Sequence, residues 1–294
     1  MGTAPRQPSP SKTLRFDEAH PFISQIGLCM DFKGRTALVT GASSGIGAAF
    51  ARDLAARGCQ VVLVARREQR LMELATEIEN RYGRSTHVVV ADLSQPTAPA
   101  IVHAATEKLG LHIDILVNNA GFATYGPFDT IDPDRDHAMV MVNVAAVVDL
   151  THHYLPGMLT KGVGAIINVS SAAAFQAMPY QAVYAASKAF VQSFSEALWA
   201  EYRTRGIRIV ACCPSATDTE YFQVLGNDDE ALMGPKRPPE GVVRDSLRAL
   251  ERNRPHVVIG YPWKLVALVP RAMPRATMAR FSERIMRPKR HPGS

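Results

Sequence analysis

The sequence predicts an α/β protein in which helices cover both faces of one parallel sheet. Short apolar runs that read as buried strands alternate with helical stretches from Arg35 to about residue 260. The first of these strands leads directly into a glycine-rich turn and then a helix. A length of 294 residues is enough for one large domain of this kind, and no internal repeat or second domain is evident.

Composition and charge restrict the class of protein. Hydrophobic residues make up 47% of the chain, as in ordinary soluble proteins, and the net charge is +6. The excess positive charge lies mostly near the C-terminus, and no basic helix with interleaved aromatic residues indicates a nucleic-acid partner. The four cysteines lack metal-ligand spacing, and the adjacent Cys212 and Cys213 are typical of reduced thiols. With no secretory signal evident, we expect a cytoplasmic protein that binds no metal.

The first strand, R-T-A-L-V-T, begins at Arg35 and is followed by Gly41-A-S-S-G-I-Gly47 and by a helix that ends before Gly58. Glycines let a backbone come close to a pyrophosphate, and a helix N-terminus offers free N–H groups and a positive dipole end. Such a glycine cluster can also be a simple tight turn. Its position between a strand and a helix favours phosphate binding.

The second strand, Q-V-V-L-V-A, ends at Ala65, where a site for NAD would carry an acidic residue. Arg66 and Arg67 follow instead, and a guanidinium suits the 2′-phosphate of NADP. Both arginines can also be solvated surface charge. Because cations are mildly unfavourable at a helix start, their presence favours a ligand, and we expect NADP(H) rather than NAD(H).

The next two strands end in polar or small residues. T-H-V-V-V-A leads to Asp92 and Leu93, where the carboxylate is placed either to accept from an adenine amino group or to cap the next helix. I-D-I-L-V leads to N-N-A-G, residues 118–121. Ligands of open parallel sheets bind at the carboxyl ends of strands, so both segments are expected at the ligand site.

A long helix is expected from about Pro133 to Thr160, with Asn143 in the middle of an apolar run. A buried asparagine must find hydrogen-bond partners. Asn143 is therefore either a satisfied core amide or the centre of a kinked helix whose freed carbonyl holds a water.

The fifth strand leads to an uncharged stretch that contains Ser171, Tyr184 and Lys188. Tyr184 and Lys188 are four residues apart, so on a helix they lie on the same face. A phenol has a pKa of roughly 10, and a nearby cation favours the phenolate, which suits an acid/base catalyst. Ser171 can donate a hydrogen bond to a substrate oxygen. The alternative is an ordinary surface pair of tyrosine and lysine.

The C-terminal part of the chain is expected to close the sheet. The sixth strand, I-R-I-V-A-C-C, ends at Pro214, and residues 219–239 are expected to form a mobile flap. A helix from about Pro239 to Arg252 and the strand H-V-V-I-G follow. Residues 263–290 interleave apolar and basic residues, which indicates an amphipathic helix that packs on the body or a second subunit, or lies on an anionic membrane. We favour packing.

Together, the motifs T-G-A-S-S-G-I-G, N-N-A-G and Y-A-A-S-K, with Asn143 and Ser171, resemble the short-chain dehydrogenase/reductase family. The resemblance covers about residues 33 to 260. It implies a Rossmann-type, doubly wound sheet of seven parallel strands, hydride transfer with a nicotinamide cofactor, and a homodimer or homotetramer. We expect a partly disordered arm over residues 1–32, a catalytic domain over 33–262 and a basic amphipathic extension over 263–294.

The resemblance also implies roles for individual residues. Tyr184 is the expected general acid/base, Lys188 binds the nicotinamide ribose, Ser171 holds the substrate oxygen and Asn143 completes a proton relay. The family often has glycine after Pro214, where this chain has Ser215, and that side chain either narrows the nicotinamide pocket or replaces a glycine that the turn does not require. The residues expected around the cofactor are Gly41, Ser43, Ser44, Ile46, Gly47, Arg66, Arg67, Asp92, Leu93, Asn118, Ala120, Gly121, Tyr184, Lys188, Pro214, Thr217 and Thr219.

Together, these expectations predict an enzyme that catalyses the NADPH-dependent reduction of a ketone or aldehyde, or the reverse oxidation of a secondary alcohol. A catalytically silent nucleotide-binding scaffold of the same fold is the alternative. Phe175, Met178, Tyr221 and Phe222 are expected to line the substrate pocket and indicate a bulky apolar compound. A peripheral membrane contact through the C-terminal extension is a further possibility.

Overall fold

The structure is a computed structural model that describes residues 30–219, 236–260 and 274–288. Its backbone contacts divide the chain into two units, Met1–Met30 and Asp31–Ser294, and every element below belongs to the second unit. Tyr221, Phe222, most of the expected flap and residues 261–273 lie outside the described residues. The expected boundaries of arm, catalytic domain and extension stay predictions.

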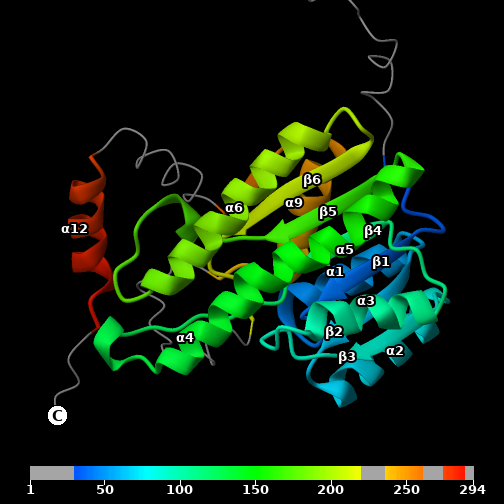
Figure 1. Ribbon diagram of the computed structural model, residues 1–294, viewed down its shortest axis with the longest axis horizontal. Coiled ribbons are helices and arrows are strands. Elements are labelled where there is room, and N and C mark those ends of the chain that lie inside the picture. Colours follow the sequence, from blue (N-terminus) through cyan, green and yellow to red (C-terminus); the bar gives the residue numbers. More distant parts are fainter. Residues whose placement is uncertain (1–29, 220–235, 261–273, 289–294) are drawn as a thin grey trace, which may run out of the picture. The chain divides into compact units, whose positions relative to one another are not determined.

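Seven parallel strands form one sheet in the order β3-β2-β1-β4-β5-β6-β7, as Figure 1 shows. This topology confirms the predicted doubly wound, Rossmann-type fold. The strand order reverses between β1 and β4, and this switch point is where such sheets open a crevice for a ligand. The strands are β1 (Thr36–Thr40), β2 (Gln60–Ala65), β3 (Thr86–Val90), β4 (Ile115–Asn118), β5 (Gly164–Val169), β6 (Ile207–Pro214) and β7 (His256–Ile259).

The central strands are apolar along their whole length because helices cover both of their faces. All residues of β1, β4 and β5 are buried, whereas β3 at the edge ends with the exposed Val90. Two groups of helices provide the cover, α1, α2 and α9 on one face and α3, α5 and α6 on the other (Figure 1). These helices are α1 (Gly45–Ala56), α2 (Glu68–Tyr82), α3 (Ala98–Lys108), α5 (Ala146–Lys161), α6 (Ala182–Tyr202) and α9 (Pro239–Glu251).

The long helix expected over Pro133 to Thr160 is present but interrupted. It consists of α4 (Pro133–Val140), a π-helical turn (Met141–Ala145) and α5. Asn143 lies in that turn, as the kinked-helix interpretation expects, and it is also fully buried, as a core amide would be. Within the described part of the chain, Pro133–Lys161 is the stretch with the length and hydropathy of a membrane span; half of it is buried, and α5 packs on β4, β5 and α3 as a core helix does.

Shorter elements complete the described chain. The 3-10 helices Phe128–Thr130 and Ala172–Phe175 follow β4 and β5 respectively. The C-terminal helix α12 (Arg275–Met286) begins after Pro274, as the sequence predicts. Cys212 and Cys213 are on opposite faces of β6, since Cys212 contacts Ser246 of α9 and Cys213 contacts Gln192 of α6.

Candidate active site

The glycine turn after β1 is anchored to the end of β4 across the switch point. The Thr40 hydroxyl accepts hydrogen bonds from the backbone N–H groups of Asn119 and Ala120, at 2.9 and 3.0 Å. The Asn119 side chain donates to the Thr40 carbonyl at 2.9 Å. Gly41 has a φ of +64°, which favours glycine. These bonds fix the turn directly above the crevice.

Gly47 shows how tightly this turn is packed. A Cβ atom at Gly47 would lie 2.3 Å from the Gly41 carbonyl oxygen and 2.5 Å from the Asn119 amide nitrogen. No side chain fits there without moving the turn. The glycine spacing of the sequence is therefore a requirement of this turn and of its contact with Asn119.

The N-terminus of α1 has the properties of an anion site. Its N-cap residue, Ser44, makes no side-chain capping bond, and its first turn contains no acidic residue. The Arg67 guanidinium donates to the Ser43 hydroxyl at 3.0 Å and to the Ser44 hydroxyl at 2.8 Å. Uncapped N–H groups, two hydroxyls and a guanidinium are donors for phosphate oxygens. This end of the site fits the phosphates of a dinucleotide.

The residues expected near the adenine lie beside that anion site. Asp92 accepts from the backbone N–H of Ser94 at 3.1 Å and from its hydroxyl at 2.9 Å. The carboxylate therefore closes a local turn, whereas Thr97 is the N-cap of α3. Arg66 is 73% exposed and lies 4.0 Å from the Asp92 carboxylate. Leu93 is buried in the core below.

Tyr184 and Lys188 lie on the same face of α6, and both are buried, at 8% and 5% exposure. The Lys188 ammonium donates to the Val169 carbonyl at 2.9 Å and lies 5.8 Å from the centre of the Tyr184 ring. Burial lowers the pKa of Lys188 from 10.5 to about 8. Because both side chains are buried, Tyr184 and Lys188 are not an ordinary surface pair.

The two serines at the end of β5 have different environments. Ser170 is buried, and its hydroxyl donates to the Lys188 carbonyl at 2.7 Å. Ser171 is partly exposed, and its hydroxyl accepts from the Ala173 N–H at 3.1 Å, which leaves its proton available for another acceptor. This difference supports Ser171 over Ser170 as the donor to a substrate oxygen.

Asn143 connects three parts of the site through its side chain. Its amide nitrogen donates to the Phe122 carbonyl at 3.1 Å and to the Ser187 hydroxyl at 3.0 Å. Its amide oxygen accepts from the Phe122 N–H at 3.2 Å. A Cβ at Gly121 would lie 2.9 Å from this oxygen and 3.2 Å from the Lys188 nitrogen. Gly121 therefore allows Asn143 and Lys188 to approach the same backbone.

The Asn118 side chain does not enter the crevice. It is 3% exposed and donates to the Asn168 side chain at 2.9 Å, and Asn168 in turn donates to the Ser195 hydroxyl at 2.9 Å. This buried polar layer links β4, β5 and α6 beneath the site. Only the backbone of Asn118 is therefore left for a contact with a cofactor. Of the predicted residues in this segment, Ala120 and Gly121 lie closer to the surface.

The segment after β6 returns to the glycine turn. Thr219 packs against α1, because a Cβ at Gly45 would lie 2.8 Å from its methyl carbon. Thr217 forms a backbone bridge with Arg237, and the Asp218 N–H donates to the Arg237 carbonyl at 2.8 Å. The two ends of the segment expected as a flap are thus joined at its base.

Ser215 takes the place of the glycine expected from the family. The described residues with positive φ other than glycine are Tyr180 and Asn253, so Ser215 has an ordinary backbone conformation. Its N–H donates to the Ile259 carbonyl at 3.0 Å. The turn after Pro214 therefore does not require glycine.

The structure separates the two described residues that were expected in the substrate pocket. Met178 packs against an apolar cluster that contains Tyr184. The Phe175 ring lies 6.1 Å, edge to face, from the ring of His256 at the start of β7. Met178 thus lies near Tyr184, whereas Phe175 packs on the edge of the sheet.

Three residues have positioning contacts that sequence reasoning did not predict, namely Thr40, Asn119 and Ser187, although Asn119 lies in the expected segment 118–121. The first two anchor the glycine turn, and Ser187 joins Asn143 to the carbonyl of Tyr184, to which its hydroxyl donates at 2.7 Å. All three lie inside motifs that the sequence analysis used. The sequence could have indicated these roles, because each residue has a polar side chain and lies in a motif with glycines or with a predicted catalytic residue.

Comparison with known protein families identifies the same motifs. A family model described as short chain dehydrogenase matches residues 35–230. A very-long-chain 3-oxoacyl-CoA reductase of Anas platyrhynchos is 36% identical over 244 residues, which cover 79% of this chain and 76% of that protein. The 17-beta-hydroxysteroid dehydrogenase type 3 of Homo sapiens is 38% identical over 198 residues, which cover 66% and 63%.

Solved structures show the same architecture. A structure from a study of 7beta-hydroxysteroid dehydrogenase stereoselectivity matches with a TM-score of 0.78 and 32% identity, covering 86% of this chain and 98% of that chain. A short-chain dehydrogenase from Sphingobium yanoikuyae in complex with NADPH matches with a TM-score of 0.73 and 31% identity, covering 81% and 94%.

The buried ammonium predicts a pH-dependent stability. The pKa of Lys188 is about 8 in the folded protein and 10.5 in the unfolded chain, a difference worth roughly 3 kcal/mol. This loss of folding free energy, which results from burying the charged ammonium, is fully present below pH 8 and disappears as the pH rises towards 10.5. In urea unfolding, Lys188→Met should therefore be more stable than the wild type at pH 7, by up to about 3 kcal/mol, and this difference should shrink at pH 9.5.

Lys108→Met, at an exposed position of α3, is the control and should change stability little at either pH. A stability difference for Lys188→Met that stays constant between the two pH values would contradict the lowered pKa.

Proposed function

Because the chain belongs to the short-chain dehydrogenase/reductase family, whose members are NAD(P)-dependent oxidoreductases of C=O and CH–OH groups, we propose that it uses NADPH to reduce the carbonyl of a bulky apolar ketone or aldehyde. The observation that carries this proposal is the burial of Tyr184, Lys188 and Asn143, together with a partly exposed Ser171 whose hydroxyl proton is available. A silent scaffold has no need for a buried ammonium, which costs stability.

The dinucleotide supplies a hydride to the carbonyl carbon. Negative charge then grows on the carbonyl oxygen, and the hydroxyls of Ser171 and Tyr184 are assigned to hold that oxygen. Tyr184 gives it a proton, and the ammonium of Lys188 favours the phenolate that results. Asn143 lies in the π-helical turn, and we assign its backbone carbonyl to a water through which Tyr184 is reprotonated.

NADPH is proposed over NADH because of the arginines that follow β2. Arg67 donates to both serines of the glycine turn, and Arg66 lies near Asp92. Two positive charges thus follow β2 directly, at the position where a site for NAD would carry an acidic residue, and this supports a 2′-phosphate as their ligand. The solved relative from Sphingobium yanoikuyae binds NADPH.

The bulky apolar substrate is proposed from the site wall and from the relatives. Tyr184 belongs to an apolar cluster against which Phe122, Tyr125 and Met178 pack. The relatives include proteins named for very-long-chain 3-oxoacyl-CoA and for hydroxysteroids. The first name describes a compound with a long acyl chain and a carbonyl group, and the second describes a steroid with a hydroxyl group.

A cytoplasmic homo-oligomer remains part of the proposal. The described cysteines, at positions 59, 212 and 213, are free thiols, as in a reducing compartment. Phe190 and Phe194 stack on α6, with ring centres 5.8 Å apart, and Phe190 is 41% exposed. This exposed aromatic pair is a candidate contact between subunits.

A membrane contact is favoured by the outer face of α12. Phe281 and Ile285 are 57% and 44% exposed at adjacent turns of this helix. Arg280 and Arg284 are exposed beside them. Such a face suits the surface of a bilayer with anionic lipids.

Replacement of Tyr184 by Phe tests the assignment of the acid/base. The variant keeps the ring but loses the proton, so its kcat for ketone reduction should fall by about 100-fold or more, whereas its Kd for NADPH should stay within about twofold. Stopped-flow absorbance and NADPH fluorescence measure the two quantities. An active Phe variant would remove Tyr184 from the mechanism.

Replacement of Arg66 or Arg67 by Ala tests the cofactor preference. Each variant should raise the KM for NADPH about tenfold or more and change that for NADH much less, since a charge-assisted bond to the 2′-phosphate is lost. Arg81→Ala, at the other end of α2, is the control and should change neither. Equal effects of the Arg66 and Arg67 variants on both cofactors would refute the preference.

Sedimentation with vesicles tests the membrane contact. The protein should sediment with vesicles that contain phosphatidylserine more than with phosphatidylcholine alone, and the double variant Phe281→Ser, Ile285→Ser should lose this binding. Phe128→Ser, which removes another exposed phenyl ring, is the matched control. Equal sedimentation of both variants would mean that α12 is not the contact.

A further inference from the structure

The carboxylate of Asp136, in the first turn of α4, is buried in the protein. Asp136 is 9% exposed, and its carboxylate accepts a hydrogen bond from the Thr124 hydroxyl at 2.7 Å. Among the residues that the structure describes, Thr124 is its one hydrogen-bond donor, and no lysine, arginine or histidine pairs with it. A buried carboxylate costs folding free energy unless other groups compensate for its charge. A further compensating group is therefore expected next to Asp136.

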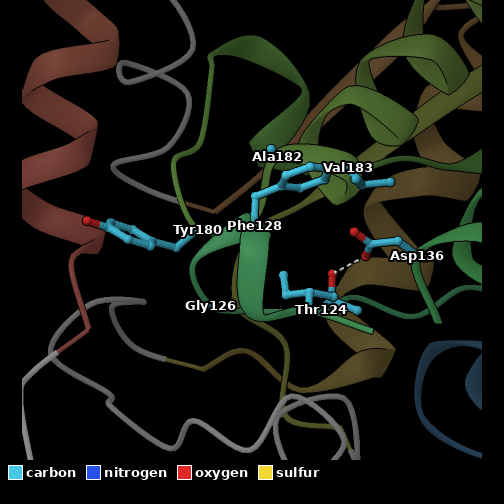
Figure 2. Close-up of a pocket in the computed structure, with 8 residues that line it drawn as sticks. Thr124, Gly126, Phe128, Asp136, Tyr180, Ala182 and Val183 are labelled. Atoms are coloured by element: carbon cyan, nitrogen blue, oxygen red, sulfur yellow. Dashed lines mark hydrogen bonds between the residues drawn. The ribbon is translucent and has the colours of Figure 1, made fainter. Parts of the chain in front are cut away.

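A small cavity joins this carboxylate to the first turn of α6. Its volume is about 20 Å³, which is enough for one water. The residues that line it are Thr124, Gly126, Phe128, Ile131, Asp136, Tyr180, Ala182 and Val183. Figure 2 shows the carboxylate of Asp136 turned towards these residues. The cavity thus contains polar groups from the loop after β4 and from α4, and it reaches the beginning of α6.

The beginning of α6 has donors but no acceptor of its own. The first bond within the helix runs from the Ala185 N–H to the Gln181 carbonyl, at 2.9 Å, so the N–H groups of Ala182 and Val183 have no acceptor inside the helix. The N-cap residue Gln181 makes no side-chain capping bond, and the first turn contains no acidic residue. Gln181 is also 2% exposed, and its Nε2 has no partner in the described part of the chain. The helix start therefore combines uncapped N–H groups with the positive end of the dipole of α6.

Asp136 supplies the negative charge that this helix start lacks. A carboxylate near a helix N-terminus is stabilised by the dipole and by the free N–H groups. One water in the cavity can accept from an N–H group of α6 and donate to the carboxylate, which makes the contact without direct approach of the two helices. Each group then compensates for the burial of the other.

The same face of α4 also packs near the phenol of Tyr184. Met139 follows Asp136 by three residues, so their side chains lie on one face of α4. Met139 is fully buried in the apolar cluster that contains Tyr184. Ala182 and Val183, which line the cavity, directly precede Tyr184 in the first turn of α6. The contact between α4 and α6 thus has an apolar part at Tyr184 and a polar part at the turn that carries Tyr184.

We propose that Asp136 is a positioning residue for Tyr184, because its carboxylate, through one water in this cavity, caps the N–H groups at the start of α6 and fixes the turn that carries the phenol. Asp136 itself touches neither the substrate nor the cofactor. Its effect on turnover rests on the proposed ketone reduction, whereas the water and the capping contact do not.

A crystal structure of the wild-type protein tests the capping contact without any substitution. An ordered water should lie within hydrogen-bond distance of the Asp136 carboxylate and of the N–H group of Ala182 or Val183. A cavity without such a water, or a water bound to Asp136 alone, would overturn the contact.

The variant Asp136→Asn tests the positioning role, because it keeps an acceptor for Thr124 and removes the negative charge. With a steroid ketone as substrate, its kcat should fall about tenfold, whereas the KM for the ketone and the Kd for NADPH should stay within about twofold. Hydrogen exchange followed by mass spectrometry should be faster in peptides that cover residues 182–184. Asp134→Asn is the matched control, since Asp134 lies exposed in the same turn of α4, and it should behave as the wild type.

An equal loss of kcat in both variants, or a rise of KM and Kd that matches the loss of kcat, would overturn the positioning role. Unchanged exchange at residues 182–184 in Asp136→Asn would show that the carboxylate does not hold the helix start. If the wild type reduces no ketone, the proposed function fails and the effect on turnover fails with it. The crystal structure and the exchange measurement still decide in that case whether Asp136 caps α6.

Discussion

The buried ammonium of Lys188 is the constraint on which the arrangement of the site depends. An ammonium removed from water is costly unless nearby groups compensate for its charge. Here the Val169 carbonyl accepts from it, and the carbonyl of Lys188 itself is held by the Ser170 hydroxyl. Both partners lie at the end of β5, so α6 must pack in one register on that strand. Gly121 completes the arrangement, since a larger residue would displace the ammonium.

The two halves of the site meet in the short segment after β4. On one side, the N–H groups of Asn119 and Ala120 donate to the Thr40 hydroxyl and so anchor the glycine turn that we propose for the phosphates. On the other side, Gly121 is in contact with Asn143 and Lys188. The proposed cofactor site and the proposed acid/base residues are therefore connected through a few residues of backbone. This compactness follows from the switch point of the sheet, where neighbouring strands lead away in opposite directions.

The family match covers residues 35–230, and α12 lies beyond it. Chemistry in such a fold is set by the strand ends, whereas the choice of substrate depends on segments packed around them. The hydroxyls of Tyr125 and Tyr180 join this helix to two loops that precede or pack near Tyr184.

Local sequence determined the strands, the glycine turn and the four-residue spacing of Tyr184 and Lys188, because each depends on neighbours in the chain. Tertiary structure alone decided that the Asn118 side chain points into the core, that Phe175 packs on His256, and that α12 bonds to Tyr125. The last contact spans 161 residues of sequence. No periodicity or motif encodes a contact of that range, because it exists only once the sheet has brought distant segments together. The bounds of α2 and α3 were likewise known only from the structure, because their sequence patterns resemble those of many surface helices.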